Sequence, residues 1–243
     1  MTTTAPAAGS TPAPKSLVAR FIGIITAPRA TFETVAASPK VLGMLLTVSL
    51  LTGVFSALPL TTDAGKQAML EQQVQTMQSM GFQVNDQMYE GMQKGTARLP
   101  YTTGIGAVIF IPIVSLVFAG ILFAIFNAAL GGEASFKQVY SVYIHSGVIS
   151  VVSAMLTGVV NYFSGRAGSV ANLGALLPML PEKSFLANLL GTVDIFIIWS
   201  LIVLAIGLGV LYKRRTQPIA ITFFSLYAVI ALAIALFKSR GGA

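Results

Sequence analysis

Residues 104–130 read GIGAVIFIPIVSLVFAGILFAIFNAAL, an apolar stretch without a charged side chain. A helix needs about 20 apolar residues to cross the hydrocarbon core of a bilayer, which is about 30 Å thick. Four further stretches meet this length requirement, at 41–60, 139–163, 185–212 and 219–237. The sequence therefore predicts an all-α fold, a polytopic membrane bundle with five transmembrane helices.

The composition of the whole chain also indicates a membrane protein. Hydrophobic residues make up 55% of the chain and charged residues 9%, and the mean hydropathy is +0.79, whereas soluble domains are about 25% charged. The net charge is +7, but the longest basic run is KRR at 213–215, and no aromatic residues interleave with it. We therefore expect the basic residues to contact lipid headgroups rather than nucleic acid.

Three regions are expected along the chain. Residues 1–15 are polar and rich in Pro, Ala and Thr, which predicts a disordered tail. Residues 16–40 form an interfacial, juxtamembrane region, and residues 41–243 form the membrane domain. Within that domain, residues 61–100 are the one sizeable polar segment, which predicts an extracytoplasmic helical insertion between the first and second spans.

The juxtamembrane region contains a short amphipathic pattern. Phe32, Val35 and Ala36 fall on one face of a helix, and Arg29 and Glu33 fall on another. This pattern suits a helix that lies in the membrane surface, and a plain linker is the alternative.

The insertion is rich in Gln and Met and reads as a helical hairpin. Leu70, Val74 and Met77 share one helix face, Gly81 ends that helix, and Asn85 is placed to cap a second one. Two interpretations stay open: a methionine-bearing surface that adapts to a partner, or a hairpin that packs on its own membrane domain.

The orientation follows from the basic residues only weakly. With a cytoplasmic N-terminus, the inside segments hold eight Lys and Arg and the outside segments seven. The tight loop YKRRTQP at 212–218 favours a cytoplasmic N-terminus, because positive charge beside short loops resists translocation. The expected lipid-headgroup contacts are Arg20, Arg29, Lys40, Lys213, Arg214 and Arg215.

Three stretches carry a resemblance to a known family: ITAPRATFETVAASPKVLGMLL at 25–46, LGGEASFKQVYSVYIHSGV at 130–148 and VDIFIIWSLIVLAIGLG at 193–209. From about residue 21 to its end, the chain resembles the Yip1-domain membrane proteins. The resemblance implies a five-helix membrane domain with a cytoplasmic N-terminus. Eukaryotic members bind small trafficking GTPases and organise secretory membranes, whereas some bacterial members are associated with ABC-type exporters. The long N-terminal region of eukaryotic members is missing here, which favours a bacterial-type protein of the inner membrane.

Four polar side chains inside the expected spans are the candidate functional residues: Asp194, His145, Asn188 and Asn161. An intramembrane carboxylate costs several kcal/mol unless it faces the bundle interior, water or a partner. From the helical rise, Asp194 in the outer half and His145 in the inner half are offset by about 8 to 15 Å along the membrane normal. A direct ion pair between them is therefore not expected.

Three roles for Asp194 stay open. It can hydrogen-bond to Asn161 or Ser150 and fix the register of the outer half of the bundle. It can act with His145 in a water-linked proton relay through Tyr140, Tyr143 or Ser146, or it can contact a partner protein.

The residue inventory argues against an enzyme. An aspartyl protease needs two carboxylates at one site, and Ser146 and His145 are adjacent in sequence, so a helix turns them apart. The chain has no HExxH motif, no phosphate-binding GxxxxGK[ST] motif and no cysteine. We expect no catalytic residues, no cofactor and no metal site.

Small residues recur every four positions on three of the expected spans. Such small-residue ladders let helix backbones approach closely, either within one bundle or between two proteins. The ladders are Ser49, Gly53 and Ala57; Gly120, Ala124 and Ala128; and Ser146, Ser150, Ala154 and Gly158.

Taken together, the sequence predicts a non-enzymatic membrane protein that associates with another membrane assembly, for which the resemblance suggests ABC exporter subunits; self-association is also open. The first alternative is a small proton-coupled transporter or channel that uses Asp194 and His145. The second is a membrane-shaping or trafficking factor like the eukaryotic relatives.

Overall fold

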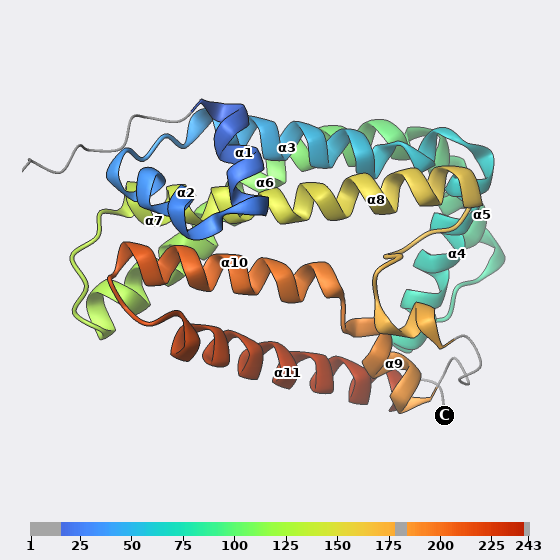
Figure 1. The fold of residues 1–243 in the computed structure, drawn as a ribbon. Coiled ribbons are helices and arrows are strands. Elements are labelled where there is room, and N and C mark those ends of the chain that lie inside the picture. Colours follow the sequence, from blue (N-terminus) through green and yellow to red (C-terminus); the bar gives the residue numbers. More distant parts are fainter. Residues whose placement is uncertain (1–15, 178–183, 241–243) are drawn as a thin grey trace, which may run out of the picture.

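The computed structural model describes residues 16–177 and 184–240, and in this part every extended regular element is a helix. Long helical segments run side by side and alternate in direction (Figure 1). They are α3 (Leu42–Ala57), α6 (Leu99–Phe123), α7 (Phe136–Ser146) continued by α8 (Val148–Ser164), α10 (Ile195–Leu211) and α11 (Thr216–Arg240). The prediction of an all-α helical bundle is confirmed.

Shorter elements cover the two ends of the bundle (Figure 1). One end, the α1–α2 end, carries α1 (Leu17–Thr26) and α2 (Pro28–Ala37). The other end, the α4–α5 end, carries the pair α4 (Asp63–Ser79) and α5 (Asp86–Gly95) together with α9 (Phe185–Thr192). Short 3₁₀ turns, η1 (Pro59–Thr61), η2 (Thr96–Arg98) and η4 (Leu173–Leu176), join these elements at the same end.

Three helical stretches in the described residues are long and apolar enough to cross a membrane: Asp86–Ala129, Phe136–Ser164 and Thr216–Ser239. The apolar helices α3 and α10 have 16 and 17 residues, or about 24 to 26 Å at the helical rise. This length is less than the hydrocarbon core of about 30 Å. The apolar membrane bundle is thus established, and five complete crossings stay a prediction.

Local sequence signals explain where several helices begin and end. Pro59 begins η1 one residue after α3 ends. Ser135 caps α7 with a capping box: its hydroxyl accepts from the Gln138 amide, and the Gln138 side chain accepts from the Ser135 amide. Pro112 lies inside α6, where the Ser115 hydroxyl donates to the Pro112 carbonyl at 2.8 Å. α6 continues into the π-helical turn η3 (Ala124–Ala129).

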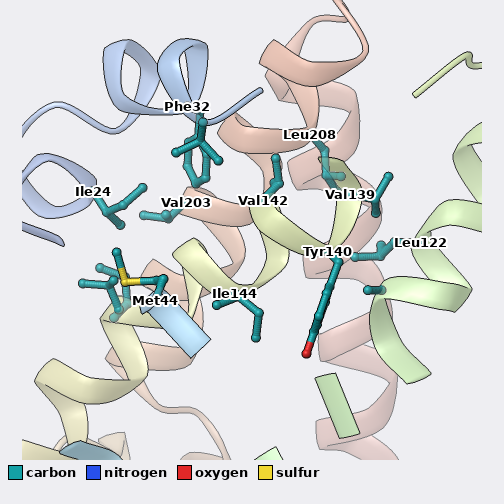
Figure 2. Close-up of a cluster of buried hydrophobic side chains, with 14 of the residues drawn as sticks. Ile24, Phe32, Met44, Leu122, Val139, Tyr140, Val142, Ile144, Val203 and Leu208 are labelled. Carbon is teal, nitrogen blue, oxygen red and sulfur yellow. The ribbon is translucent and has the colours of Figure 1, made fainter. Parts of the chain in front are cut away.

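The core lies where α1 and α2 meet the long helices (Figure 2). Ile24 of α1, Phe32 of α2, Met44 of α3 and Val142 of α7 are all fully buried in it. Gly207 of α10 permits this packing, because a Cβ atom there would lie 2.6 Å from Val142 and 3.0 Å from the Phe32 ring.

This packing shows which face of the juxtamembrane helix meets the bundle. A helix does form at Pro28–Ala37, but Phe32 and Val35 on its apolar face are fully buried in the described structure. The apolar face therefore packs against α7 and α10, and the position of this helix at the membrane surface stays a prediction. The opposite face stays exposed, and on it Nε of Arg29 lies 3.9 Å from Oε1 of Glu33.

The insertion at 61–100 folds as its sequence indicates. α4 ends at Ser79, and Gly81 follows with a left-handed φ of +86°, a conformation that suits glycine. Asn85 caps α5 by accepting a hydrogen bond from the Met88 amide at 2.8 Å. Both predictions are confirmed. Between α4 and α5 lies an open groove of about 380 Å³, lined by Met69, Gln72, Gln73, Thr76, Met77 and Met92.

Candidate functional site

Asp194 lies at a break between two helices. Residues 185–212 were expected to form one continuous span, but the helix stops at Thr192 and restarts at Ile195, with Val193 and Asp194 in extended conformation. Asp194 is the N-cap of α10, and its carboxylate accepts hydrogen bonds from the amides of Phe196 at 2.7 Å and Ile197 at 3.3 Å. The carboxylate satisfies backbone donors that a new helix leaves free, which is the physical reason for the break.

Partners far along the chain hold this break in place. The Ser169 hydroxyl donates to the Asp194 carboxylate, and the Tyr227 hydroxyl accepts from the Asp194 amide at 3.1 Å while donating to the Thr192 carbonyl at 2.7 Å. Asn172 forms an isolated antiparallel bridge with Asp194. Asp194 is 7% exposed and has no salt bridge among the described residues.

The other expected partners of Asp194 bond elsewhere. Asn161, on α8, donates to the Gly168 carbonyl at 2.8 Å, and its buried Oδ1 has no hydrogen-bond partner among the described residues. Asn188 donates to the Ser184 carbonyl at 3.1 Å within α9. Within the described residues Asp194 therefore bonds to neither Asn161 nor Ser150; instead the Ser169 hydroxyl donates to its carboxylate, and the Tyr227 hydroxyl accepts from its backbone amide.

Two adjoining cavities lie along α3 and α8: the larger lies beside Asp194 at the start of α10, and the smaller reaches η1 and α4. The larger has about 330 Å³ and is lined by Asp194 and six hydroxyl side chains: Ser56, Ser150, Ser153, Thr157, Ser169 and Ser200. The smaller has about 200 Å³ and includes Asn161 and Arg166 in its lining. Both cavities share Ser56, Ala154 and Thr157. The spacing of Ser150, Ser153 and Thr157 on one helix face is a sequence signal for this polar surface, and a search for intramembrane charges alone does not detect it.

His145 forms a second buried polar site with Arg20. His145 is fully buried, its Nδ1 lies 2.7 Å from the Ser141 carbonyl oxygen, and its Nε2 lies 3.2 Å from Nη1 of Arg20. Because a carbonyl only accepts, Nδ1 carries the proton and Nε2 accepts from the guanidinium. Arg20 also donates to the Lys40 carbonyl at 3.4 Å.

Arg20 differs from the other expected headgroup contacts. Its side chain is 7% exposed and turned into the bundle, so it ties α1 to α7 instead of standing free at the membrane surface. The remaining basic residues of this set are exposed: Arg29, Lys40, Lys213, Arg214 and Arg215. Among them Arg214 donates to the Leu130 carbonyl at 2.7 Å.

The described contacts do not link His145 to Asp194. The expected relay residues bond elsewhere: the Tyr140 hydroxyl lies 3.1 Å from Ser115 Oγ, Ser146 donates to the Val142 carbonyl, and Tyr143 stacks on Phe118. By the helical rise, His145 lies about 14 Å from the start of α7, and Asp194 lies about 26 Å from the end of α10. The start of α7 and the end of α10 lie at the same side of the bundle (Figure 1), so His145 and Asp194 lie at different depths in it.

The three small-residue ladders lie in different surroundings. On α3, a Cβ atom at Gly53 would lie 2.8 Å from the Gly104 carbonyl oxygen of α6; on α8, one at Gly158 would overlap the Phe55 carbonyl of α3. These two ladders thus bring α3 close to α6 and α8. At Gly120 of α6, a Cβ atom would meet nothing within 4 Å, and Ala124 and Ala128 are exposed.

A bundle of long apolar helices, closed at each end by short helices and buried polar contacts, defines a helical integral membrane protein. The Yip1 domain matches residues 22–237, and the chain belongs to this family. A similar protein is "Membrane protein YknW" of Bacillus subtilis (strain 168), with 27% identity over 226 residues that cover 92% of this chain and 93% of that protein. No solved structure matches the chain.

Proposed function

We propose that this Yip1-family protein is a non-enzymatic membrane protein that binds another membrane protein through α6. The observation that carries the proposal is the open ladder of Gly120, Ala124 and Ala128. In the membrane, small residues favour helix association because they let backbones approach closely. The ladders of Gly53 and Gly158 are filled by neighbouring helices of the same chain, whereas a Cβ atom at Gly120 would meet no neighbour.

Two further features of α6 fit a protein contact. The open ladder runs into the π-helical turn Ala124–Ala129, and single π-helical turns within α-helices occur frequently at functional sites. Large apolar side chains flank the ladder, with Val117 57% and Ile121 49% exposed, and these can pack against a partner helix on either side.

The hairpin α4–α5 supplies a second contact outside the bundle. Its open groove is lined by Met69, Met77 and Met92, and flexible methionine side chains adapt to irregular partner surfaces. The proposed partner is an ABC-type exporter, the assembly that the resemblance to bacterial members suggested. The membrane-shaping alternative loses support, because the apolar face of α2 packs on the bundle.

Cross-linking in native membranes tests the proposal. The chain has no cysteine, so Ala124→Cys on α6 and Ala228→Cys on α11 each provide a single reactive thiol at an exposed alanine. We expect Ala124→Cys, and not Ala228→Cys, to form a stoichiometric adduct identified by mass spectrometry as an exporter subunit.

A packing variant shows whether the ladder itself makes the contact. Gly120→Leu fills the ladder and should abolish co-purification of the partner, while the matched control Ala228→Leu should retain it. Recovery of this chain alone from cross-linked membranes, or an unchanged complex in Gly120→Leu, would refute the proposal.

A further inference from the structure

The larger of the two cavities, which contains Asp194, carries hydroxyl groups from α3, α8 and α10. Ser56, Ser150, Ser153, Thr157 and Ser200 line the larger one, and none of these five hydroxyls forms a hydrogen bond within the described residues. Other helical hydroxyls, such as those of Thr47, Ser146 and Thr222, bond to the preceding turn of their own helix, while the buried Ser49 and Thr52 hydroxyls of α3 likewise have no partner in the described residues. The hydroxyls at the cavity are therefore free to bond to something inside it.

The strictly accepting group of the larger cavity also has unused capacity. The Asp194 carboxylate accepts from the Ser169 hydroxyl and from the amides of Phe196 and Ile197, and it is buried without a cationic partner in the described structure. A carboxylate only accepts hydrogen bonds, and hydroxyls can accept as well as donate. The occupant that complements them donates several hydrogen bonds and carries positive charge.

We propose that these cavities bind the primary ammonium group of an amphipathic or zwitterionic ligand, with Asp194 as the counter-charge. Thr157 and Ser153 accept further hydrogen bonds from the ammonium group, while Arg166 in the smaller cavity lies beside an anionic group of the same molecule. A phosphoethanolamine unit has this chemistry, either as a lipid headgroup or as a free molecule.

The size and the spread of the lining favour such a group over a bare metal ion. The larger cavity alone has about 330 Å³, which is in the range of small-molecule sites. The described residues contain no cluster of three His, Asp or Glu side chains that could hold a metal. Asp194 lines the larger cavity and Arg166 the smaller one, so an elongated ligand reaches both charged side chains.

Lipid retention measures the proposed binding. The purified full chain is equilibrated with mixed micelles of phosphatidylethanolamine and phosphatidylcholine, and native mass spectrometry counts the lipids retained. Phosphatidylcholine is the matched competitor, because its quaternary ammonium carries the same charge but donates no hydrogen bond. We expect the wild type to retain phosphatidylethanolamine about tenfold over phosphatidylcholine, as for one charge-assisted hydrogen bond.

Three variants separate the site from the fold. Asp194→Asn keeps a good helix cap and should lose the preference, with unchanged thermal stability as the check on folding. Thr157→Val removes one cavity hydroxyl at nearly constant shape and should weaken the preference severalfold. Thr222→Val on α11, where the hydroxyl bonds only to the Pro218 carbonyl, is the control and should leave it unchanged.

A soluble arm distinguishes the source of the ammonium group. If free phosphoethanolamine competes with the lipid at equal concentration, the site binds the soluble molecule. If only the lipid binds, the site recognises a lipid headgroup. Equal retention of both lipids by the wild type, together with no binding of free phosphoethanolamine, overturns the proposal and identifies a water-filled crevice. The readout does not depend on α6, so its failure is distinct from a failure of the proposed partner contact.

Discussion

Gly158 and Gly120 provide a matched test of how the bundle is packed. Both are glycines in apolar helices, but a Cβ atom at Gly158 would overlap the Phe55 carbonyl oxygen, while one at Gly120 would meet nothing within 4 Å. The Gly158→Ala substitution therefore forces α3 and α8 apart, and Gly120→Ala changes no internal contact.

The expected energies follow from two opposing terms. Overpacking costs about 1–3 kcal/mol, and the upper end applies at Gly158 because the obstacle is a main-chain carbonyl that no rotamer change can move. Replacing a helical glycine by alanine gains about 1 kcal/mol in helix propensity. We expect Gly158→Ala to lower the free energy of unfolding by about 2 kcal/mol, and Gly120→Ala to raise it by about 0.5–1 kcal/mol.

Trp199 makes the measurement direct. It is the one tryptophan of the chain and packs against the core from α10, so its fluorescence follows unfolding of the bundle. Both variants are unfolded at equilibrium by increasing the fraction of dodecyl sulfate in mixed micelles. If Gly158→Ala proves as stable as Gly120→Ala, α3 and α8 do not approach each other as closely as the structure indicates. The contrast between the filled α8 ladder and the open α6 ladder would then be refuted as well.

Two further predictions concern the buried Arg20–His145 pair and the orientation of the chain. Removing one member of the Arg20–His145 pair leaves the other buried without its partner, so Arg20→Met and His145→Leu should each lower the free energy of unfolding by about 1–3 kcal/mol. In the same dodecyl sulfate titration, the double variant should lose less than the sum of the two single losses. Strict additivity would refute the contact. The orientation is tested with single cysteines at the exposed Ser38 and Met80 and a membrane-impermeant maleimide on intact cells. We expect the maleimide to label Met80→Cys at once and Ser38→Cys only after lysis. The reverse pattern would place the N-terminus outside.

Much of the fold was readable from the sequence because its signals are local. The apolar stretches, the turn glycine Gly81 and the cap residue Asn85 each act through neighbours within a few residues. Helix capping and left-handed turn geometry depend on such short-range bonds. These features therefore appear in the structure at the positions that the sequence indicated.

The break before α10 was not readable, because its determinants lie far apart. Asp194 bonds to Ser169, 25 residues away, and to Tyr227, 33 residues away. A count of apolar residues predicts one continuous span through Val193 and its neighbours. The same limit applied to Phe32, whose place beside Gly207 depends on contact between α2 and α10, and to Arg20, whose acceptor His145 lies 125 residues on.

The distribution of these interactions supports the assignment of α6 as the free face. At the α1–α2 end, Arg20 ties α1 to α7; at the α4–α5 end, Asp194 and Tyr227 tie α10 to α9 and α11. Between the ends, glycine contacts draw α3 against α6 and α8. α6 carries a long exposed apolar surface and, at Gly120, a small residue that no part of the described chain covers. In a membrane, small residues favour the close approach of another helix, so the open ladder supports the proposed partner contact.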